Sequence, residues 1–319
     1  MINGIIKCLV LCPNAQDATS FYRAAGPFAV MRKQFPIEFT YASQVDWPLL
    51  SNHDMVFFQR PFNESHLRVF DAAKDMNIPT WVDYDDDILN IPKTNPAYAV
   101  FQNNKGKTII ERADLLTVST PQLAETYGKF RKDKTTKVIS NGIMVPMKTE
   151  PSQKREHPVV LWRGSPSHIG DTSILTKWLS HPKFAKAKIH AVGFLPPDIA
   201  DDPRVEHMPW IQLFDFYKYI NHLAPNYIVV PLADNLFNDC KSNIAWLEGL
   251  SCGAVTLASP VREFRHVSFE EYVDMPTDDA FYKQLAMANK YGVAELNFER
   301  FKSVCDLLGL KITEDRKTA

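Results

Sequence analysis

Short apolar runs alternate with helical patterns along the whole chain. Each run has four to nine residues, is rich in Val, Ile and Phe, and is bounded by polar or turn-forming residues. Such runs are typical of parallel strands covered on both faces. In the first half they are 4–12, 37–42, 54–59, 79–82, 114–118 and 137–140, and in the second half 159–162, 188–193, 205–208, 227–232 and 254–259. The repetition of strand, helix and strand predicts doubly wound α/β sheets.

One segment interrupts this alternation and predicts two domains. Residues 144–158, MVPMKTEPSQKREHP, contain three prolines and five charged residues and no sustained apolar period, so we interpret them as a linker. A chain of 319 residues also exceeds what one core usually fills. We therefore expect two Rossmann-like parallel-sheet domains facing across a cleft, residues 1–147 and 148–295. A last helix within 296–319 could pack across both.

Individual helices carry readable signals. Thr120 is suited to cap a helix that has Pro121 at its first position, with Leu123 and Tyr127 on its apolar face. Near the C-terminus, Phe301 belongs to a helical apolar pattern.

Composition narrows the class of protein. The chain is 45% hydrophobic, and 36 Lys and Arg against 37 Asp and Glu give a net charge of −1, so no global electrostatic footprint for nucleic acid exists. The opening run reads as a strand and not as a signal peptide, and no run is long enough to span a membrane. Five scattered cysteines without a CxxC pair indicate a reduced, cytoplasmic protein without disulfides or structural zinc.

Ligands of open parallel sheets bind at the carboxyl ends of the strands, so the loops there deserve inspection. The most informative segment is 231–259, where we expect a helix from about Asp239 that ends at Gly253. Lys241 and Ser242 would lie in its first turn, where free N–H groups favour phosphate. Glu248 would lie on the same face about 10 Å away. The alternative is a surface lysine and glutamate on an ordinary helix.

This segment resembles the donor-binding region of the retaining glycosyltransferases of family four, which have the GT-B fold. The resemblance implies that Lys241 binds the donor diphosphate and that Glu248 binds ribose hydroxyls. Residues 159–171, VVLWRGSPSHIGD, are similar to the first strand and loop of the donor domain, which implies that Arg163 and the adjoining Gly164 contact the diphosphate. Residues 111–143 resemble the end of the acceptor domain. One position departs, because Cys240 stands where the family has a glutamate that contacts the transferred sugar.

The chemistry explains these residue types. Cleavage of a sugar from a nucleoside diphosphate places negative charge on phosphate, which Arg163 and Lys241 would stabilise without a metal ion. We count both as catalytic candidates. The alternative for Arg163 is a surface salt bridge.

The acidic run Asp83, Tyr84, Asp85, Asp86, Asp87 follows the strand at 79–82. It could bind magnesium or manganese, but we interpret it as an acceptor-side cluster in which Asp85 is the catalytic candidate. Four carboxylates need a partner, for which we predict Arg60 or Arg23. The alternative is capping of a helix that begins near Ile88.

Three further features are weaker. Trp210 lies near the nucleobase or else in the core. His168 contacts diphosphate or acceptor, and we place it with the acceptor residues, although a solvated loop histidine is the alternative. The basic run 129–137 could follow a phosphate backbone, although such a run is usually a solvated helix end.

The resemblance thus implies transfer of a sugar from a UDP-linked donor to a hydroxyl, with retention and no additional cofactor, and the sequence favours no membrane insertion. Small chains with a D-x-D-D run also resemble bacteriophage transferases, some of which glycosylate hydroxymethylated bases of DNA. This makes such DNA the leading specific acceptor, ahead of glycan or protein hydroxyls. The alternatives in other classes are a UDP-sugar epimerase and an inactive nucleotide-binding module.

Overall fold

A computed structural model of the chain describes residues 4–12, 17–132, 134–288 and 291–311. It confirms two parallel-sheet α/β units, and each of the eleven predicted runs forms a strand. Unit 1 comprises residues 1–89, 101–142 and 292–319, and unit 2 comprises 90–100 and 143–291.

The sheet of unit 1 has the order β2-β1-β3-β4-β5-β6, and every pairing is parallel. Its strands are β1 Ile6–Leu11, β2 Ile37–Tyr41, β3 Met55–Gln59, β4 Thr80–Tyr84, β5 Leu115–Val118 and β6 Thr136–Val138. Since β2 lies on one side of β1 and β3 on the other, the strand order reverses between β1 and β3. Ligands of doubly wound sheets bind at such a switch point.

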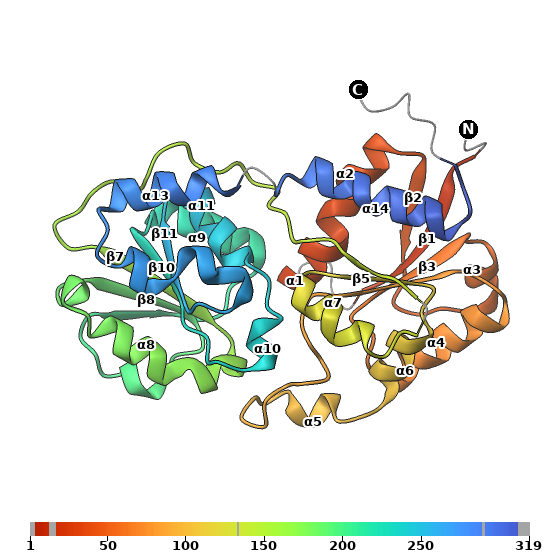
Figure 1. Cartoon of the computed structure of the whole chain (residues 1–319), viewed down its shortest axis with the longest axis horizontal. Coiled ribbons are helices and arrows are strands. Elements are labelled where there is room, and N and C mark those ends of the chain that lie inside the picture. The colour runs from red at the N-terminus through yellow and green to blue at the C-terminus, as the bar shows by residue number, and fades with distance from the viewer. Residues whose placement is uncertain (1–3, 13–16, 133, 289–290, 312–319) are drawn as a thin grey trace. The chain divides into compact units, whose positions relative to one another are not determined.

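Helices cover the sheet of unit 1 (Figure 1). They are α1 Ala18–Ser20, the π-helical turn η1 Phe21–Ala25, α2 Gly26–Gln34, α3 Trp47–Ser51, α4 Glu64–Asp75, α6 Lys105–Arg112, α7 Pro121–Gly128 and α14 Val293–Leu307, while α5 spans Tyr98–Phe101. The cap predicted for α7 is confirmed, because Thr120 Oγ1 accepts a hydrogen bond from the backbone N–H of Leu123 and Pro121 opens the helix.

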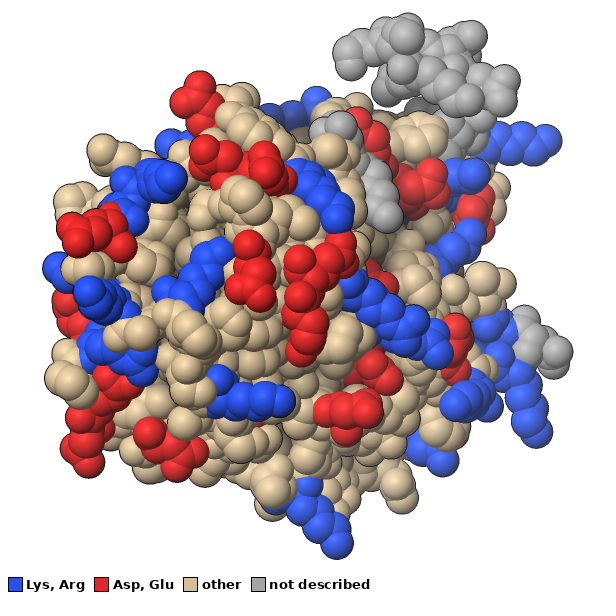
Figure 2. Space-filling view, turned by 60° about the vertical axis from the view of Figure 1, so that its left-hand side comes forward, with Lys and Arg blue, Asp and Glu red and all other residues tan. Residues whose placement is uncertain are grey.

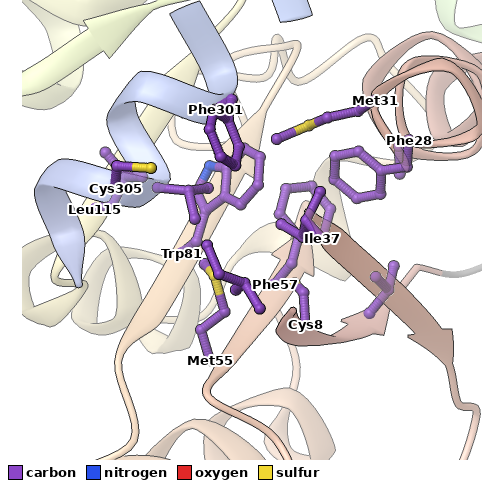
Figure 3. Packing of buried hydrophobic residues seen from close by; sticks show 14 residues of the cluster. Cys8, Phe28, Met31, Ile37, Met55, Phe57, Trp81, Leu115, Phe301 and Cys305 are labelled. Carbon is purple, nitrogen blue, oxygen red and sulfur yellow. The ribbon is translucent and has the colours of Figure 1, made fainter. Parts of the chain in front are cut away.

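An aromatic core joins both ends of the chain within unit 1. Phe28 from α2, Phe57 from β3 and Trp81 from β4 pack together, and Phe301 and Cys305 of α14 complete the cluster (Figure 3). α14 lies alongside α2, in agreement with the apolar pattern predicted around Phe301 (Figure 1). The last helix is therefore an integral layer of unit 1.

The sheet of unit 2 has the order β11-β10-β7-β8-β9, again wholly parallel. Its strands are β7 Val159–Gly164, β8 Lys188–Gly193, β9 Val205–Met208, β10 Tyr227–Val230 and β11 Val255–Ala258. The order reverses between β7 and β10, so the expected ligand position is above these two strands.

Helices of unit 2 alternate with short 3-10 turns. The α-helices are α8 Thr172–Leu179, α9 Leu213–Leu223, α10 Leu236–Asp239, α11 Ile244–Cys252, α12 Phe269–Tyr272 and α13 Thr277–Ala286. The 3-10 helices are η2 Pro166–Asp171, η3 Pro182–Phe184, η4 Pro197–Ile199 and η5 Arg262–Val267.

Residues 144–158 contain no helix or strand, in agreement with the predicted linker. They are nevertheless attached to unit 2, because the Ser152 N–H donates to Gly253 O and the Lys148 N–H donates to Leu250 O. The chain enters unit 2 after Gly142 and returns to unit 1 at Gly292, whereas the pattern placed these boundaries at 147 and 295. Residues 90–100 also belong to unit 2. An apolar pattern identifies elements but does not reveal on which core a connecting segment packs.

Candidate functional site

Arg163 and Glu248 form an ion pair at the carboxyl end of β7. Arg163 Nη2 lies 2.8 Å from Glu248 Oε2, and the guanidinium carbon lies 4.6 Å from the centroid of the Phe216 ring. The Glu248 side chain is 2% exposed and that of Arg163 is 22% exposed. A buried carboxylate and an aromatic face thus hold a guanidinium whose outer part reaches the surface beside the switch point.

The sequence assigned these two residues to separate parts of a ligand, and the structure brings them into direct contact. The alternative of a salt bridge for Arg163 therefore holds in this structure, although its partner is a buried helix residue and not a surface one. The pairing orients the guanidinium. The ligand contacts of Arg163 and Glu248 stay predictions.

The helix predicted from Asp239 to Gly253 is wrong in its first half. α10 begins earlier, because Asn235 Oδ1 accepts a hydrogen bond from the Asn238 N–H, and it ends at Asp239; α11 begins only at Ile244. Lys241 and Ser242 lie between the two helices and not in a first turn. Asp239, Ser242 and Asn243 flank the break, and all three residue types have a low helix propensity.

The predicted spacing of Lys241 and Glu248 along one helix face therefore does not apply. Lys241 Nζ lies 4.6 Å from the centroid of the Phe237 ring, so its ammonium group is placed over an α10 side chain. The predicted end of the segment is confirmed, because Gly253 adopts the left-handed conformation at φ 81°.

Two glycines bring backbone and Trp210 close together at the same edge of the sheet. A Cβ on Gly164 would lie 2.5 Å from the Trp162 ring, and one on Gly193 would lie 2.4 Å from Gly164 O and 2.9 Å from Trp210 Cε3. Trp210 itself is 52% exposed, which excludes the alternative that it belongs to the core. Its contact with a nucleobase remains a prediction.

His168 is not a solvated loop histidine. Its Nδ1 lies 2.9 Å from Asp171 Oδ2 within η2, and Asp171 in turn accepts hydrogen bonds from the Ala233 N–H and from Asn238 Nδ2. Both residues belong to unit 2, on the side of the predicted donor residues.

In unit 1, Arg60 forms ion pairs with two carboxylates that follow β4, those of Asp85 and Asp86. Its Nη2 lies 2.7 Å from both Asp85 oxygens, 3.7 Å from Asp86 Oδ2 and 3.1 Å from Thr19 Oγ1. Arg60 directly follows β3 and adopts φ 49°, a left-handed conformation that is uncommon for a residue with a side chain. The predicted arginine partner is confirmed at this position, beside the switch point of unit 1.

Burial dominates the electrostatics of this cluster. It raises the pKa of the Asp85 carboxyl; Arg60 opposes the shift and Asp86 adds to it, so that the pKa stays above its ordinary value. For Arg60 burial acts to lower the pKa, but Asp85 and Asp86 together outweigh burial and raise it. The Asp86 side chain is 30% exposed against 10% for Asp85, so Asp86 offers the more accessible carboxylate.

Arg23 and Asp83 form a second pair, which is fully internal. Arg23 Nε and Nη2 donate to the two Asp83 oxygens at 2.7 and 2.6 Å, and Thr117 Oγ1 donates to Asp83 as well. Arg23 Nη1 donates to Ile139 O and to Asn141 Oδ1. Arg23 is thus the second confirmed arginine partner. Arg23 and Asp83 are only 1–2% exposed, so neither fits a direct contact with the acceptor.

The alternative of a helix that begins near Ile88 is wrong. The chain after β4 contains only bends, turns and irregular backbone as far as Ala97, and the Asp87 carboxylate accepts a hydrogen bond from the Leu89 N–H in a local turn. Asp87 is fully buried. Within the described ranges, no group of three or more His, Cys, Asp or Glu side chains is arranged to hold a metal ion.

The basic run 129–137 serves the structure of unit 1 in part. Arg131 is buried and its Nη1 donates to Ile110 O and Ala113 O, while Lys134 Nζ donates to Arg112 O and Ala113 O. These side chains cap the carboxyl end of α6. On the face shown in Figure 2, Lys and Arg side chains are interspersed with Asp and Glu.

Sequence reasoning gave no individual role to three polar residues of these sites, Asp171, Asn238 and Thr19, although all three lie in segments that follow predicted strands. Asp171 had a signal, since His168 and Asp171 are three residues apart in a short loop. Asn238 and Thr19 had none, because their partners lie 67 and 41 residues away in the chain.

The two parallel α/β units form the GT-B fold, and solved structures of glycosyltransferases share it. Anabaena HepE, in complex with UDP and glucose, matches with a TM-score of 0.61 and 15% identity over 94% of this chain and 100% of that one. The catalytic domain of starch synthase IV from Arabidopsis thaliana, bound to ADP and acarbose, matches with a TM-score of 0.59 and 9% identity over 96% and 100%. A protein from Listeria monocytogenes assigned as a UDP-N-acetylglucosamine 2-epimerase matches with a TM-score of 0.54 and 12% identity over 95% and 96%.

No protein family and no curated protein matches the chain by sequence. Among the described residues, no helix combines the length and apolarity needed to cross a bilayer.

Proposed function

We propose that the protein is a glycosyltransferase that moves a sugar from a nucleoside diphosphate, most simply UDP, to a hydroxyl acceptor. One observation carries the proposal: the Arg163 guanidinium stands at the carboxyl end of β7, held by buried Glu248 and the Phe216 ring, beside the switch point of a GT-B unit. The fold shared with HepE and starch synthase IV supports it.

Unit 2 is the donor unit in this proposal. Arg163 and Lys241 stabilise the charge that develops on the departing diphosphate, and Gly164 lets the backbone approach it. Ser242 contributes a hydroxyl between α10 and α11, Trp210 stacks on the nucleobase, and Glu248 orients Arg163. Transfer proceeds with retention of the anomeric configuration.

Unit 1 is the acceptor unit. Arg60, Asp85 and Asp86 form its polar group at the carboxyl edge of the sheet, and Asp85 orients the acceptor hydroxyl. Arg23, Asp83 and Asp87 are buried, so they do not contact the acceptor directly. Asp85→Ala should therefore spare UDP binding and abolish transfer.

Calorimetry with UDP, ADP and GDP, followed by UDP-release assays with UDP-sugars, tests the donor class. We expect UDP to bind and a hydroxyl acceptor to accelerate UDP release. Failure of all nucleoside diphosphates to bind would overturn the proposal. Loss of UDP binding in Asp85→Ala would instead overturn only the division of roles between the units.

Two other functions fit parts of the structure. The Listeria fold match favours an epimerase. Cys240, buried at the end of α10, stands where the resembled family has a glutamate that contacts the sugar, which favours a nucleotide-binding module without turnover. An epimerase converts a UDP-sugar when no acceptor is present, and an inactive module binds it without turnover. Product analysis by NMR separates both from a transferase.

A hydroxymethylated base in DNA is the first specific acceptor to test, followed by glycan and protein hydroxyls. The base would have to leave the stack, at a cost of a few kcal/mol. Mass spectrometry of nucleosides from such DNA, treated with protein and UDP-sugar, should show a sugar adduct. An adduct on a glycan or peptide and none on DNA would replace this acceptor.

A further inference from the structure

The His168 and Asp171 pair has a geometry that the proposed function does not yet use. In the 3-10 helix η2, residues three apart lie on the same side, so the two side chains meet, with Nδ1 of His168 2.9 Å from Oδ2 of Asp171. η2 directly follows β7, one of the two strands at the switch point of unit 2.

Asp171 also reaches the loop that follows β10, the other strand at the switch point. Its Oδ1 accepts hydrogen bonds from the Ala233 N–H at 2.7 Å and from Asn238 Nδ2 at 3.2 Å. Asp171 is 6% exposed. One buried carboxylate therefore links η2 to the loop and the helix α10 that follow β10, and it holds the His168 ring against them.

This arrangement determines which ring nitrogen carries the proton. A carboxylate only accepts hydrogen bonds, so His168 Nδ1 donates and, in the neutral ring, Nε2 is the acceptor. In the part of the chain that the structure describes, His168 Nε2 has no hydrogen-bond partner, and the side chain is 23% exposed. A neutral His168 ring thus presents an acceptor atom at the carboxyl edge of the sheet, beside the switch point.

A fixed acceptor discriminates between the parts of a nucleotide sugar. Phosphoryl oxygens only accept hydrogen bonds and would meet the neutral Nε2 acceptor to acceptor, whereas a sugar hydroxyl donates to it directly. We propose that Nε2 of His168, oriented by Asp171, accepts a hydrogen bond from a hydroxyl of the transferred sugar and so helps to select the donor sugar.

This inference rests on the proposed function and deepens it. It moves His168 from the acceptor residues, where the sequence placed it, to the donor site, because His168 and its partners all belong to unit 2. His168 is then a specificity residue, and Asp171 is a positioning residue that acts through it.

A thermodynamic cycle between protein and ligand tests the proposal. Affinities of the wild type and His168→Ala are measured by calorimetry for UDP, for the UDP-sugar that binds most tightly, and for its deoxy analogues. We expect His168→Ala to leave UDP affinity unchanged and to weaken the UDP-sugar roughly 2- to 10-fold, the worth of one neutral hydrogen bond. One deoxy analogue should lose the same factor in the wild type and nothing further in the variant.

Other outcomes overturn the inference in distinguishable ways. An equal loss for UDP and UDP-sugar would mean that His168 serves the nucleotide, and no loss for either would mean that it contacts neither. Absence of UDP binding by the wild type would overturn the proposed function, and this inference with it. His222→Gln, an exposed histidine in the last turn of α9, is the matched control and should equal the wild type.

Asp171→Asn tests the positioning role separately. The amide oxygen can keep the Ala233 N–H, which turns the amide NH₂ toward His168 Nδ1 and moves the ring proton to Nε2. We expect ¹⁵N NMR to show this change of tautomer. Nε2–H can then only donate, so the sugar hydroxyl would have to accept, and a deoxyfluoro analogue, whose fluorine only accepts, should lose less affinity in Asp171→Asn than in the wild type while UDP affinity stays unchanged. A changed tautomer with the same loss for this analogue in both proteins would overturn the role of Nε2 as acceptor.

Discussion

At the scale of single residues, Arg163 carries the guanidinium on which the proposed donor binding depends. Its guanidinium is planar and anchored by Glu248 and Phe216, and lysine cannot reproduce that arrangement. Its contact with a diphosphate would add to this existing pair.

We therefore expect Arg163→Ala and Arg163→Lys each to weaken UDP binding about 10- to 100-fold, the worth of a charged hydrogen bond. Calorimetry measures this. Arg163→Ala also leaves the Glu248 carboxylate buried without this partner, so the double variant with Glu248→Gln serves as control. The double variant should regain stability and not affinity; regained affinity would show that the single variant had only been misfolded.

Asp85 makes the free energy of unfolding depend on pH. Burial, with Asp86, holds its pKa in the folded protein above the ordinary 3.8 of the unfolded chain. The folded state then binds the proton more tightly, so ionisation of Asp85 lowers stability as pH rises from 3.8 through the raised value.

In Asp85→Asn this contribution to the pH dependence of stability is absent. The stability of the wild type relative to the variant should therefore fall between about pH 4 and the raised value and stay constant above it. Urea unfolding at a series of pH values measures the difference. Asp75→Asn, an exposed carboxyl on α4, should follow the wild type. A difference that grew with pH would contradict the direction of the pKa shift.

At the scale of elements, the carboxyl edge of the second sheet depends on close backbone approach. Gly193 ends β8 at φ 95°, and a Cβ there would lie 2.4 Å from Gly164 O. Only glycine avoids both the strain and the collision.

Gly193→Ala should cost at least about 1–3 kcal/mol in the free energy of unfolding. Gly128→Ala at the end of α7 is the matched control, because no other group lies within 4 Å of its Cβ position. That variant should be stabilised by about 0.4–1 kcal/mol. Chemical denaturation of both variants measures the two changes in the free energy of unfolding. Equal changes would show that the backbone at Gly193 relaxes to admit a Cβ at little cost.

At the scale of the whole molecule, the chain forms two units with separate cores. α14 closes the core of unit 1, where Phe301 packs with Phe28 and Trp81 (Figure 3). In unit 2, Phe281 of α13 is equally buried.

Phe301→Ala should cost about 3–5 kcal/mol and act on unit 1. Hydrogen exchange followed by mass spectrometry should show faster exchange in β1, β3 and α14 and little change in β7 and β10. Phe281→Ala should give the reverse pattern. Equal acceleration throughout the chain would mean that the two units unfold as one.

The sequence by itself determined the eleven strands, their parallel class and the irregular segment at 144–158. It could do so because strand periodicity, helix caps and turn residues are local signals, readable within a few residues. The sequence also limited the partners of the acidic run to two candidates, Arg60 and Arg23. It could do so because four carboxylates within five residues require positive charge nearby.

The tertiary structure alone decided which candidates meet. Arg163 and Glu248 are 85 residues apart, Arg23 and Asp83 are 60 apart, and Asp171 and Asn238 are 67 apart. These contacts depend on strand order and on the side to which each loop turns. The early start of α10 likewise depends on the Asn235 cap, which the apolar pattern does not record. Strand periodicity is a property of neighbouring residues, whereas a site is a property of strands that are neighbours only after folding.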